Sequence, residues 1–281
     1  MSALPRRTFL PLLAGLGLSG RTFAQQRAWL PGLQLYTVRD ALAADPDGTL
    51  RQVAQLGYRE VEPGGLAGMT VAEFQARLKH HRLAVPSIHA SYDGLRDDLD
   101  GVVREARAFG ASFVACPSVD AEERRTADDW KRVCQTFARA GRRLHGHGLT
   151  LAYHNHDYEF VPYAGGATPF ELLLRETDPE DVKLELDVYW AAKGGLDPVR
   201  CLRDNAGRVA LLHLKDLGRN GATVELGAGV LAMEQIVRTA LAIGAKHLFV
   251  EQDDSDDPLR SVAVSLRFLE GLPADVRPRR G

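Results

Sequence analysis

The stretch KLELDVYWAAKGGLDPVRCLRDNAGRVALLHLKD, residues 183–216, contains two short apolar runs separated by a segment with helical features. The runs at 183–187 and 209–215 are rich in leucine and fit short buried strands. Between them, Asp197 and Pro198 mark a helix start, because aspartate caps the first turn and proline is tolerated at its first position. Strand, helix and strand in this order predict a parallel βαβ unit.

The same alternation extends through the rest of the chain. Short apolar runs that fit strands lie at 33–37, 58–62, 84–89, 113–116, 149–154, 183–187, 209–215 and 247–251. Amphipathic segments separate them, and Gly110 and Gly148 stand just before a strand, where a glycine commonly ends a helix. Eight such units without a long linker predict an α/β fold, a single (β/α)₈ barrel over residues 25–281. A doubly wound sheet is the alternative, but no glycine-rich phosphate loop opens the chain.

Composition places the chain among ordinary globular proteins. It has 281 residues, 45% hydrophobic and 26% charged, which is enough to bury a large core. A formal net charge of −2 does not favour a nucleic-acid-binding protein, which needs a basic face. Cys116, Cys134 and Cys201 are too widely spaced for a metal motif and stand in apolar surroundings. We expect them to be buried apolar residues, with a single disulfide as the alternative.

The first residues, MSALPRRTFLPLLAGLGLSGRTFA (1–24), have the pattern of an export signal. Arg6 and Arg7 precede a short apolar stretch without acidic residues, and Thr22 and Ala24 are small residues near its end. This pattern predicts a twin-arginine signal peptide and a periplasmic protein; a Sec-type signal and an ordinary N-terminal helix are the alternatives. Cleavage removes three arginines and changes the net charge from −2 to −5. Beyond this segment, no apolar run is long enough to span a bilayer.

Polar residues gather at the carboxyl ends of the predicted strands, where a barrel of this type carries its functional groups. The last four strands end in His154, Asp187, His213 and Glu251. Burying so many ionisable groups together is costly without a counter-charge, which a divalent cation would supply. Mixed imidazole and carboxylate ligands favour Mn²⁺, Zn²⁺, Co²⁺ or Fe²⁺ over Mg²⁺ or Ca²⁺. For the strand at 149–154, His156 and Glu159 remain alternative ligands to His154.

Four segments distributed along the chain form a family pattern: QLYTVRD (34–40), YHNHDYEF (153–160), DVYW (187–190) and HLKD (213–216). With these segments the sequence resembles the xylose-isomerase-like TIM barrels, a family commonly described as sugar phosphate isomerases/epimerases. The resemblance implies a metal held by Glu, Asp, His and Glu from the last four strands. The last three ligands fall on Asp187, His213 and Glu251. His154 stands where the family has the first Glu, and Trp190 stands where metal-rich relatives often have His.

These residue types permit proton transfer next to a carbonyl group. A divalent ion on a sugar carbonyl acidifies the neighbouring C–H, so that a carboxylate or imidazole can remove the proton. Reprotonation at the same carbon epimerises the sugar, reprotonation at the next carbon isomerises it, and loss of a β-hydroxyl dehydrates it. We expect Glu251 and His156 to exchange protons, with His154 as an alternative, and Lys215 to stabilise the enediolate. Substrate contacts are expected from Glu62, His89, Trp190, Tyr36 and Glu159.

The sequence therefore predicts a metal-dependent isomerase or epimerase of an unphosphorylated sugar or keto-sugar, because no phosphate-binding loop is found. A keto-sugar or inosose dehydratase on the same site and a non-catalytic carbohydrate-binding barrel are the alternatives. An apurinic-site endonuclease, which the family also contains, needs a basic DNA face that a net charge of −5 disfavours. The expected partner is a small-molecule sugar, with neither nucleic acid nor a membrane span after signal cleavage; a homo-oligomer remains open.

Overall fold

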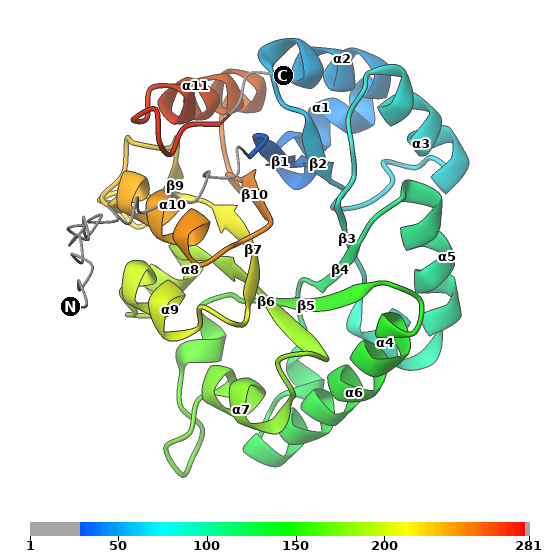
Figure 1. The fold of residues 1–281 in the computed structure, drawn as a ribbon, viewed down its shortest axis with the longest axis vertical. Helices are drawn as coiled ribbons and strands as arrows, with labels where there is room; N and C mark the ends of the chain where they lie inside the picture. The colour runs from blue at the N-terminus through cyan, green and yellow to red at the C-terminus, as the bar shows by residue number, and fades with distance from the viewer. Residues whose placement is uncertain (1–28, 279–281) are drawn as a thin grey trace, which may run out of the picture.

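The computed structural model describes residues 29–278, so the predicted signal peptide at 1–24 lies outside the described residues and stays a prediction. Eight parallel strands form a ring with helices packed around its outside (Figure 1). The strands are β1 (Gly32–Gln34), β2 (Glu60–Glu62), β3 (Ser87–His89), β4 (Phe113–Cys116), β5 (Thr150–His154), β6 (Val182–Asp187), β7 (Val209–Leu214) and β10 (His247–Val250). This arrangement confirms the predicted barrel.

The ring closes between β2 and β3 through a short bridge rather than a full ladder. The ladders run in the order β2-β1-β10-β7-β6-β5-β4-β3. At the open edge, the Val61 N–H donates to the Ala84 carbonyl at 2.8 Å, and the Ala84 N–H donates to the Arg59 carbonyl at 2.9 Å. Each strand therefore has a neighbour on both sides, and the carboxyl ends of all eight meet at one mouth of the barrel.

The helices follow the strands as the sequence pattern predicts. They are α1 (Arg39–Ala44), α2 (Pro46–Leu56), α3 (Val71–His80), α4 (Tyr92–Asp97), α5 (Leu99–Phe109), α6 (Ala127–His145), α7 (Pro169–Glu176), α8 (Val188–Lys193), α9 (Pro198–Asp204), α10 (Met233–Ala242) and α11 (Pro258–Glu270). Gly110 ends α5 with a φ of 74°, a left-handed conformation that a residue with a side chain rarely adopts. Within residues 29–278, none of these helices is long and apolar enough to cross a bilayer.

Helix α6 shows how local sequence and packing agree. Thr126 and Asp129 form a reciprocal capping box at its start, which satisfies two free backbone N–H groups. Trp130, Val133 and Phe137 lie on its inner face and are completely buried. Burial of each such side chain contributes about 1.5–3 kcal/mol, so this face fixes the helix against the outside of β5.

Two details near the mouth differ from the expected pattern. The first strand ends at Gln34, because Leu35–Val38 forms a 3₁₀ turn in which the Gln34 side chain accepts a hydrogen bond from the Tyr36 N–H at 3.0 Å. After β7, the chain forms an unpredicted hairpin of β8 (Asp216–Leu217) and β9 (Thr223–Val224). The buried Asp216 carboxylate holds this region by accepting from the N–H groups of Leu217 and Gly227.

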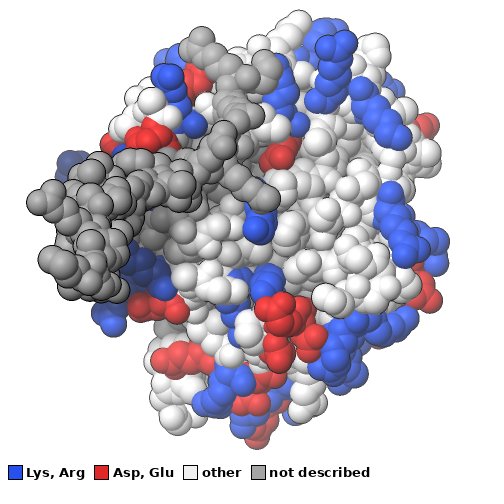
Figure 2. Space-filling model, in the orientation of Figure 1, with Lys and Arg blue, Asp and Glu red and all other residues white. Residues whose placement is uncertain are grey.

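Cysteine placement and surface charge agree with an ordinary globular protein. Cys116, Cys134 and Cys201 are all buried and unpaired, which confirms the expectation of buried apolar residues. Figure 2 shows basic and acidic side chains of the described residues around the margin of one face, with mostly uncharged residues at its centre.

Candidate active site

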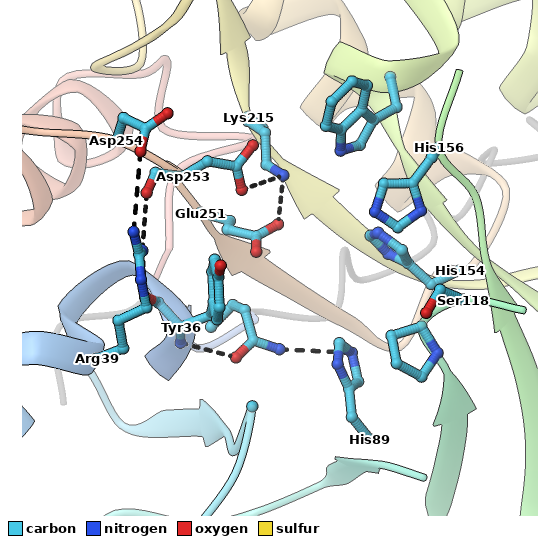
Figure 3. Close-up of a pocket in the computed structure, with 14 residues that line it drawn as sticks. Tyr36, Arg39, His89, Ser118, His154, His156, Lys215, Glu251, Asp253 and Asp254 are labelled. Atoms are coloured by element: carbon cyan, nitrogen blue, oxygen red, sulfur yellow. Dashed lines mark hydrogen bonds and ion pairs between the residues drawn. The ribbon is translucent and has the colours of Figure 1, made fainter. Parts of the chain in front are cut away.

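A polar pocket opens at the mouth where the strands end. Its volume is about 440 Å³, within the range of small-molecule sites. Figure 3 shows side chains from several strands converging on it. The lining residues are Gln34, Tyr36, Arg39, Gly64, His89, Pro117, Ser118, His154, His156, Trp190, Lys215, Glu251, Asp253 and Asp254. The pocket thus gathers most of the side chains that the sequence singled out, although they are far apart along the chain.

Lys215 is the charged centre of one wall. Its Nζ atom lies 3.1 Å from Asp187 Oδ2, 2.8 Å from Glu251 Oε2 and 3.0 Å from Asp253 Oδ1, and the residue is only 1% exposed. Burial disfavours the ammonium, but the surrounding carboxylates outweigh burial and raise the pKa of Lys215 above its ordinary value. Lys215 is therefore a fixed positive charge beside the pocket.

Glu251 is held by two donors. Its Oε2 atom lies 2.8 Å from His213 Nδ1 as well as 2.8 Å from Lys215 Nζ. Burial opposes ionisation, but these partners lower the pKa of Glu251 below its ordinary value. A carboxylate stabilised in this way is a weak base, so the geometry does not favour the proton exchange that the sequence suggested for Glu251.

Two histidines next to the pocket are neutral bases. Burial, followed by the charge of Lys215, lowers the pKa of His156 to about 4. The His156 ring lies against Tyr158 and Trp190, with centroids 5.7 Å and 5.2 Å away, and its Nδ1 atom is buried without a hydrogen-bond partner. Burial also lowers the pKa of His154 well below its ordinary value.

Two groups of side chains have donor sets that could hold a metal ion. In each, one ligand atom from every residue lies within 4.8 Å of the others. The Asp187 group consists of His154, Asp187 and His213. The Glu62 group consists of Glu62, His89, Glu185 and His213. Two imidazoles with one or two carboxylates suit Zn²⁺, Mn²⁺, Fe²⁺ or Co²⁺.

The Asp187 group contains three of the four predicted ligands. Within residues 29–278, the buried His154 Nδ1 atom has no hydrogen-bond partner, as expected for an atom that an ion would contact, whereas Asp187 Oδ2 lies 3.1 Å from the Lys215 ammonium. Glu251, the fourth predicted ligand, lies 2.8 Å from His213 Nδ1 and is not part of the group.

In the Glu62 group, two carboxylates face two imidazoles. His89 Nε2 lies 3.0 Å from Glu62 Oε2 and 3.2 Å from Glu185 Oε2. Burial opposes protonation of His89, but these carboxylates raise its pKa to about 10. Burial also opposes protonation of His213, but the neighbouring carboxylates, of which Glu185 has the largest effect, raise the pKa of His213 well above its ordinary value. Without a metal ion, both imidazoles are thus charged.

Two residues predicted to contact substrate lie behind the pocket wall. Glu159 is fully buried, and its oxygens accept from the Tyr153 hydroxyl and, at 2.8 Å, from the His156 N–H. Glu62 is also fully buried beneath His89. Neither residue lines the pocket: Glu159 contacts the His156 backbone, Glu62 belongs to the deeper ionic group, and their contacts with substrate stay predictions. His89, Tyr36 and Trp190 do line it.

Sequence reasoning gave no role to several residues of the site. Glu185 precedes Asp187 by two residues on β6, so strand alternation places it on the same face and was the available signal. Arg39 holds the rim by donating to the carbonyls of Tyr36 at 3.0 Å and Asp253 at 2.8 Å. No local pattern distinguishes such a rim arginine from an exposed one.

Comparison with known proteins identifies relatives with this fold. A family model described as "Xylose isomerase-like TIM barrel" matches residues 50–272. Inosose dehydratase from Geobacillus kaustophilus is 26% identical over 195 residues, which cover 61% of this chain and 62% of that protein. The match thus spans less than two thirds of that relative.

Solved structures agree with this assignment. A sugar phosphate isomerase/epimerase from Parabacteroides distasonis is 27% identical, with a TM-score of 0.76 and coverage of 90% of this chain and 98% of that chain. L-Ribulose 3-epimerase, at 18% identity and a TM-score of 0.65, covers 86% and 93% of the two chains and shares the fold.

Proposed function

The chain belongs to the xylose isomerase-like TIM barrel family, and from this premise we propose that it is a metal-dependent isomerase or epimerase of an unphosphorylated sugar or keto-sugar. One observation carries the proposal: a neutral imidazole, His156, and a fixed ammonium, Lys215, line the same polar pocket. Proton transfer next to a carbonyl needs this pair, because a base must take the proton and a positive charge must stabilise the resulting oxyanion.

His156 is the proposed base. Its pKa of about 4 keeps the imidazole unprotonated near neutral pH, and its Nδ1 atom is not engaged by another protein group. The Glu159 carboxylate fixes the backbone of His156 through its N–H, and the Tyr158 and Trp190 rings lie against the imidazole. The base is therefore both free to accept a proton and held in place.

Lys215 is the proposed electrostatic partner. Its three carboxylate contacts hold the ammonium in one position, so stabilisation of an enediolate oxygen requires little reorganisation. The Asp187 group would hold the divalent ion, as the donor set and the unpartnered His154 Nδ1 atom support, and the ion would polarise the substrate carbonyl as a Lewis acid.

The charge of the pocket favours an unphosphorylated substrate. Glu251, Asp253 and Asp254 contribute carboxylates to the lining. The nearby cations are already engaged, since Lys215 contacts Glu251 and Asp253, and Arg39 lies 3.8 Å from Asp254. A phosphate would add negative charge to a wall where three carboxylates already outnumber these two cations, whereas sugar hydroxyls can donate to carboxylates.

Dehydration is the second candidate reaction. Curated relatives named inosose dehydratase, matched over part of their length, support it. Dehydration would use the same proton abstraction, followed by loss of a β-hydroxyl. His154 stands where the family has its first Glu, which is consistent with a reaction other than epimerisation by two glutamates.

The test is deuterium exchange. The Mn²⁺-loaded protein is incubated in D₂O with a panel of ketoses and keto-glycosides, and products are followed by NMR. We expect deuterium at the carbon next to the carbonyl, and a loss of at least about 100-fold in rate for His156→Asn. His147→Asn, an exposed histidine outside the pocket, should exchange normally. Loss of water from the substrate would establish the dehydratase, and sugar binding without exchange would establish a binding protein instead.

A further inference from the structure

We propose that the Glu62 group, which shares only His213 with the Asp187 group, is itself a divalent-metal site beneath the pocket. Its residues come from four strands: Glu62 from β2, His89 from β3, Glu185 from β6 and His213 from β7. The inference does not depend on the proposed sugar chemistry, because metal binding at these residues can be measured without substrate.

The spacing of the donor atoms fits one ion. Glu62 Oε2 lies 2.8 Å from His213 Nε2 and 3.0 Å from His89 Nε2. Glu185 completes the set, with Oε2 3.2 Å from His89 Nε2 and Oε1 3.5 Å from His213 Nε2. Ligands about 2.1 Å from a metal lie about 3.0–3.4 Å from one another in octahedral or tetrahedral sites. Donor atoms from these four residues therefore have spacings that would fit one metal ion after only small side-chain movements.

Two buried oxygens point to a missing partner. Among the described residues, Glu62 Oε1 and Glu185 Oε1 have no hydrogen-bond partner, and both side chains are completely buried. Such oxygens are costly in a protein interior unless a donor or a cation contacts them. A divalent ion between the two carboxylates would contact these oxygens and offset both charges.

The pattern of ion pairs separates this group from the wall around Lys215. Lys215 forms ion pairs with Asp187, Glu251 and Asp253. In the described part of the chain, the ion-pair partners of Glu62 and Glu185 are all histidines. The Glu62 group thus pairs its two buried carboxylates with imidazoles alone, and an imidazole, unlike a lysine or arginine, can give up its proton and bind a metal ion instead.

Side chains behind the Glu62 group orient its members through hydrogen bonds, as in known metal sites. Glu251 holds His213 Nδ1 at 2.8 Å, which directs the opposite nitrogen, Nε2, into the group. Gln34 Nε2 donates to Glu62 Oε2 at 2.8 Å and fixes that carboxylate. Carboxylate–histidine pairs and amide donors behind the ligands are common second contacts of protein-bound metals. Gln34 and His89 also line the pocket, which gives an ion a route to the group.

The experiment compares two carboxylates on the same strand. Glu185 belongs only to the Glu62 group, and Asp187, two residues later, belongs only to the Asp187 group. Chelator-treated full chain is titrated with MnCl₂, and free Mn²⁺ is followed by EPR. We expect Glu185→Gln and Glu62→Gln to lose at least tenfold in affinity at one site, while Asp187→Asn retains that site. Circular dichroism verifies the fold of each variant.

A second measurement keeps the proposal falsifiable if a variant folds poorly. Pulsed EPR of bound Mn²⁺ in the wild-type chain should show nitrogen couplings, and His89→Asn should remove one of them, whereas His147→Asn should not. Unchanged Mn²⁺ affinity in both folded glutamate variants would overturn the site. Nitrogen couplings that persist unaltered in His89→Asn would overturn it as well.

Discussion

Replacement of Lys215 by methionine tests whether the pocket wall is organised around one buried ammonium. Lys215 contacts Asp187, Glu251 and Asp253 at 2.8–3.1 Å. Methionine retains much of the aliphatic chain but removes the charge. The variant therefore leaves the packing largely unchanged while Asp187 and Glu251 lose their nearest ammonium.

The expected cost follows from the burial of these carboxylates. Asp187 is 0% exposed and Glu251 is 6% exposed, so water does not replace the ammonium. Removing one partner of a buried ion pair typically costs about 3–5 kcal/mol. In a domain of this size, each kcal/mol lowers the melting temperature by about 2–4 °C, so we expect a fall of roughly 6–20 °C.

The stability lost in Lys215→Met should also depend on pH. Without Lys215, Asp187 and Glu251 bind protons more readily in the folded state than in the unfolded chain. The stability of the variant then decreases as pH rises, and its difference from the wild type is larger at about pH 8 than at about pH 5.

Urea denaturation of chelator-treated protein, followed by circular dichroism, measures this difference. Lys246→Met, at an exposed lysine, is the matched control and should change little. Lys215→Met/Glu251→Gln should recover part of the loss, because one unpaired charge is gone. A loss below about 1 kcal/mol that does not vary with pH would refute the reasoning.

Three further predictions concern other parts of the chain. Burial raises the pKa of Glu159 to about 7 from an ordinary 4.5, so the folded state binds this proton more tightly than the unfolded chain does. The free energy of unfolding should therefore fall by roughly 3 kcal/mol as the pH rises from 4.5 to about 7. Glu159→Gln should flatten this slope in urea titrations, and an unaltered slope would show that another group causes it. Gly141→Ala in α6 should lower the free energy of unfolding by at least about 2 kcal/mol, because the new Cβ would overlap the Asp181 carbonyl oxygen. In an open helix position the same substitution usually raises the free energy of unfolding by about 1 kcal/mol. A raised urea midpoint would contradict this prediction. We propose export by the twin-arginine route, so replacement of Arg6 and Arg7 by lysines should retain a fused reporter in the cytoplasm, and continued secretion would favour the Sec route.

The barrel was predictable because each strand–helix unit carries its own local signals. The Asp197 cap with Pro198 in the first turn of α9, and the left-handed Gly110, appear in the structure where the pattern places a helix start and a helix end. These features depend on neighbours a few residues away. A closed ring then follows from the number of units and the short connections between them.

Convergence of the strand ends was also predictable, but the choice of partners was not. His213 Nε2 contacts Glu62, 151 residues away in sequence, and its Nδ1 contacts Glu251. Which nitrogen faces which carboxylate depends on packing across the whole ring. Glu159 shows the same limit, because the 3₁₀ turn Tyr158–Phe160 directs its side chain behind His156 instead of into the pocket.

The site combines two ways of compensating buried negative charge, and they respond differently to the surroundings. Lys215 is covalently part of the chain, so the wall of Asp187, Glu251 and Asp253 keeps its cation whether or not metal is present. Glu62 and Glu185 face only imidazoles, which can be either protonated or bound to a metal. Metal binding at the Glu62 group should therefore displace protons from His89 and His213, while Lys215 keeps its own positive charge. Because His213 also contacts Glu251, the state of the deeper group is transmitted to the pocket wall through a single imidazole ring.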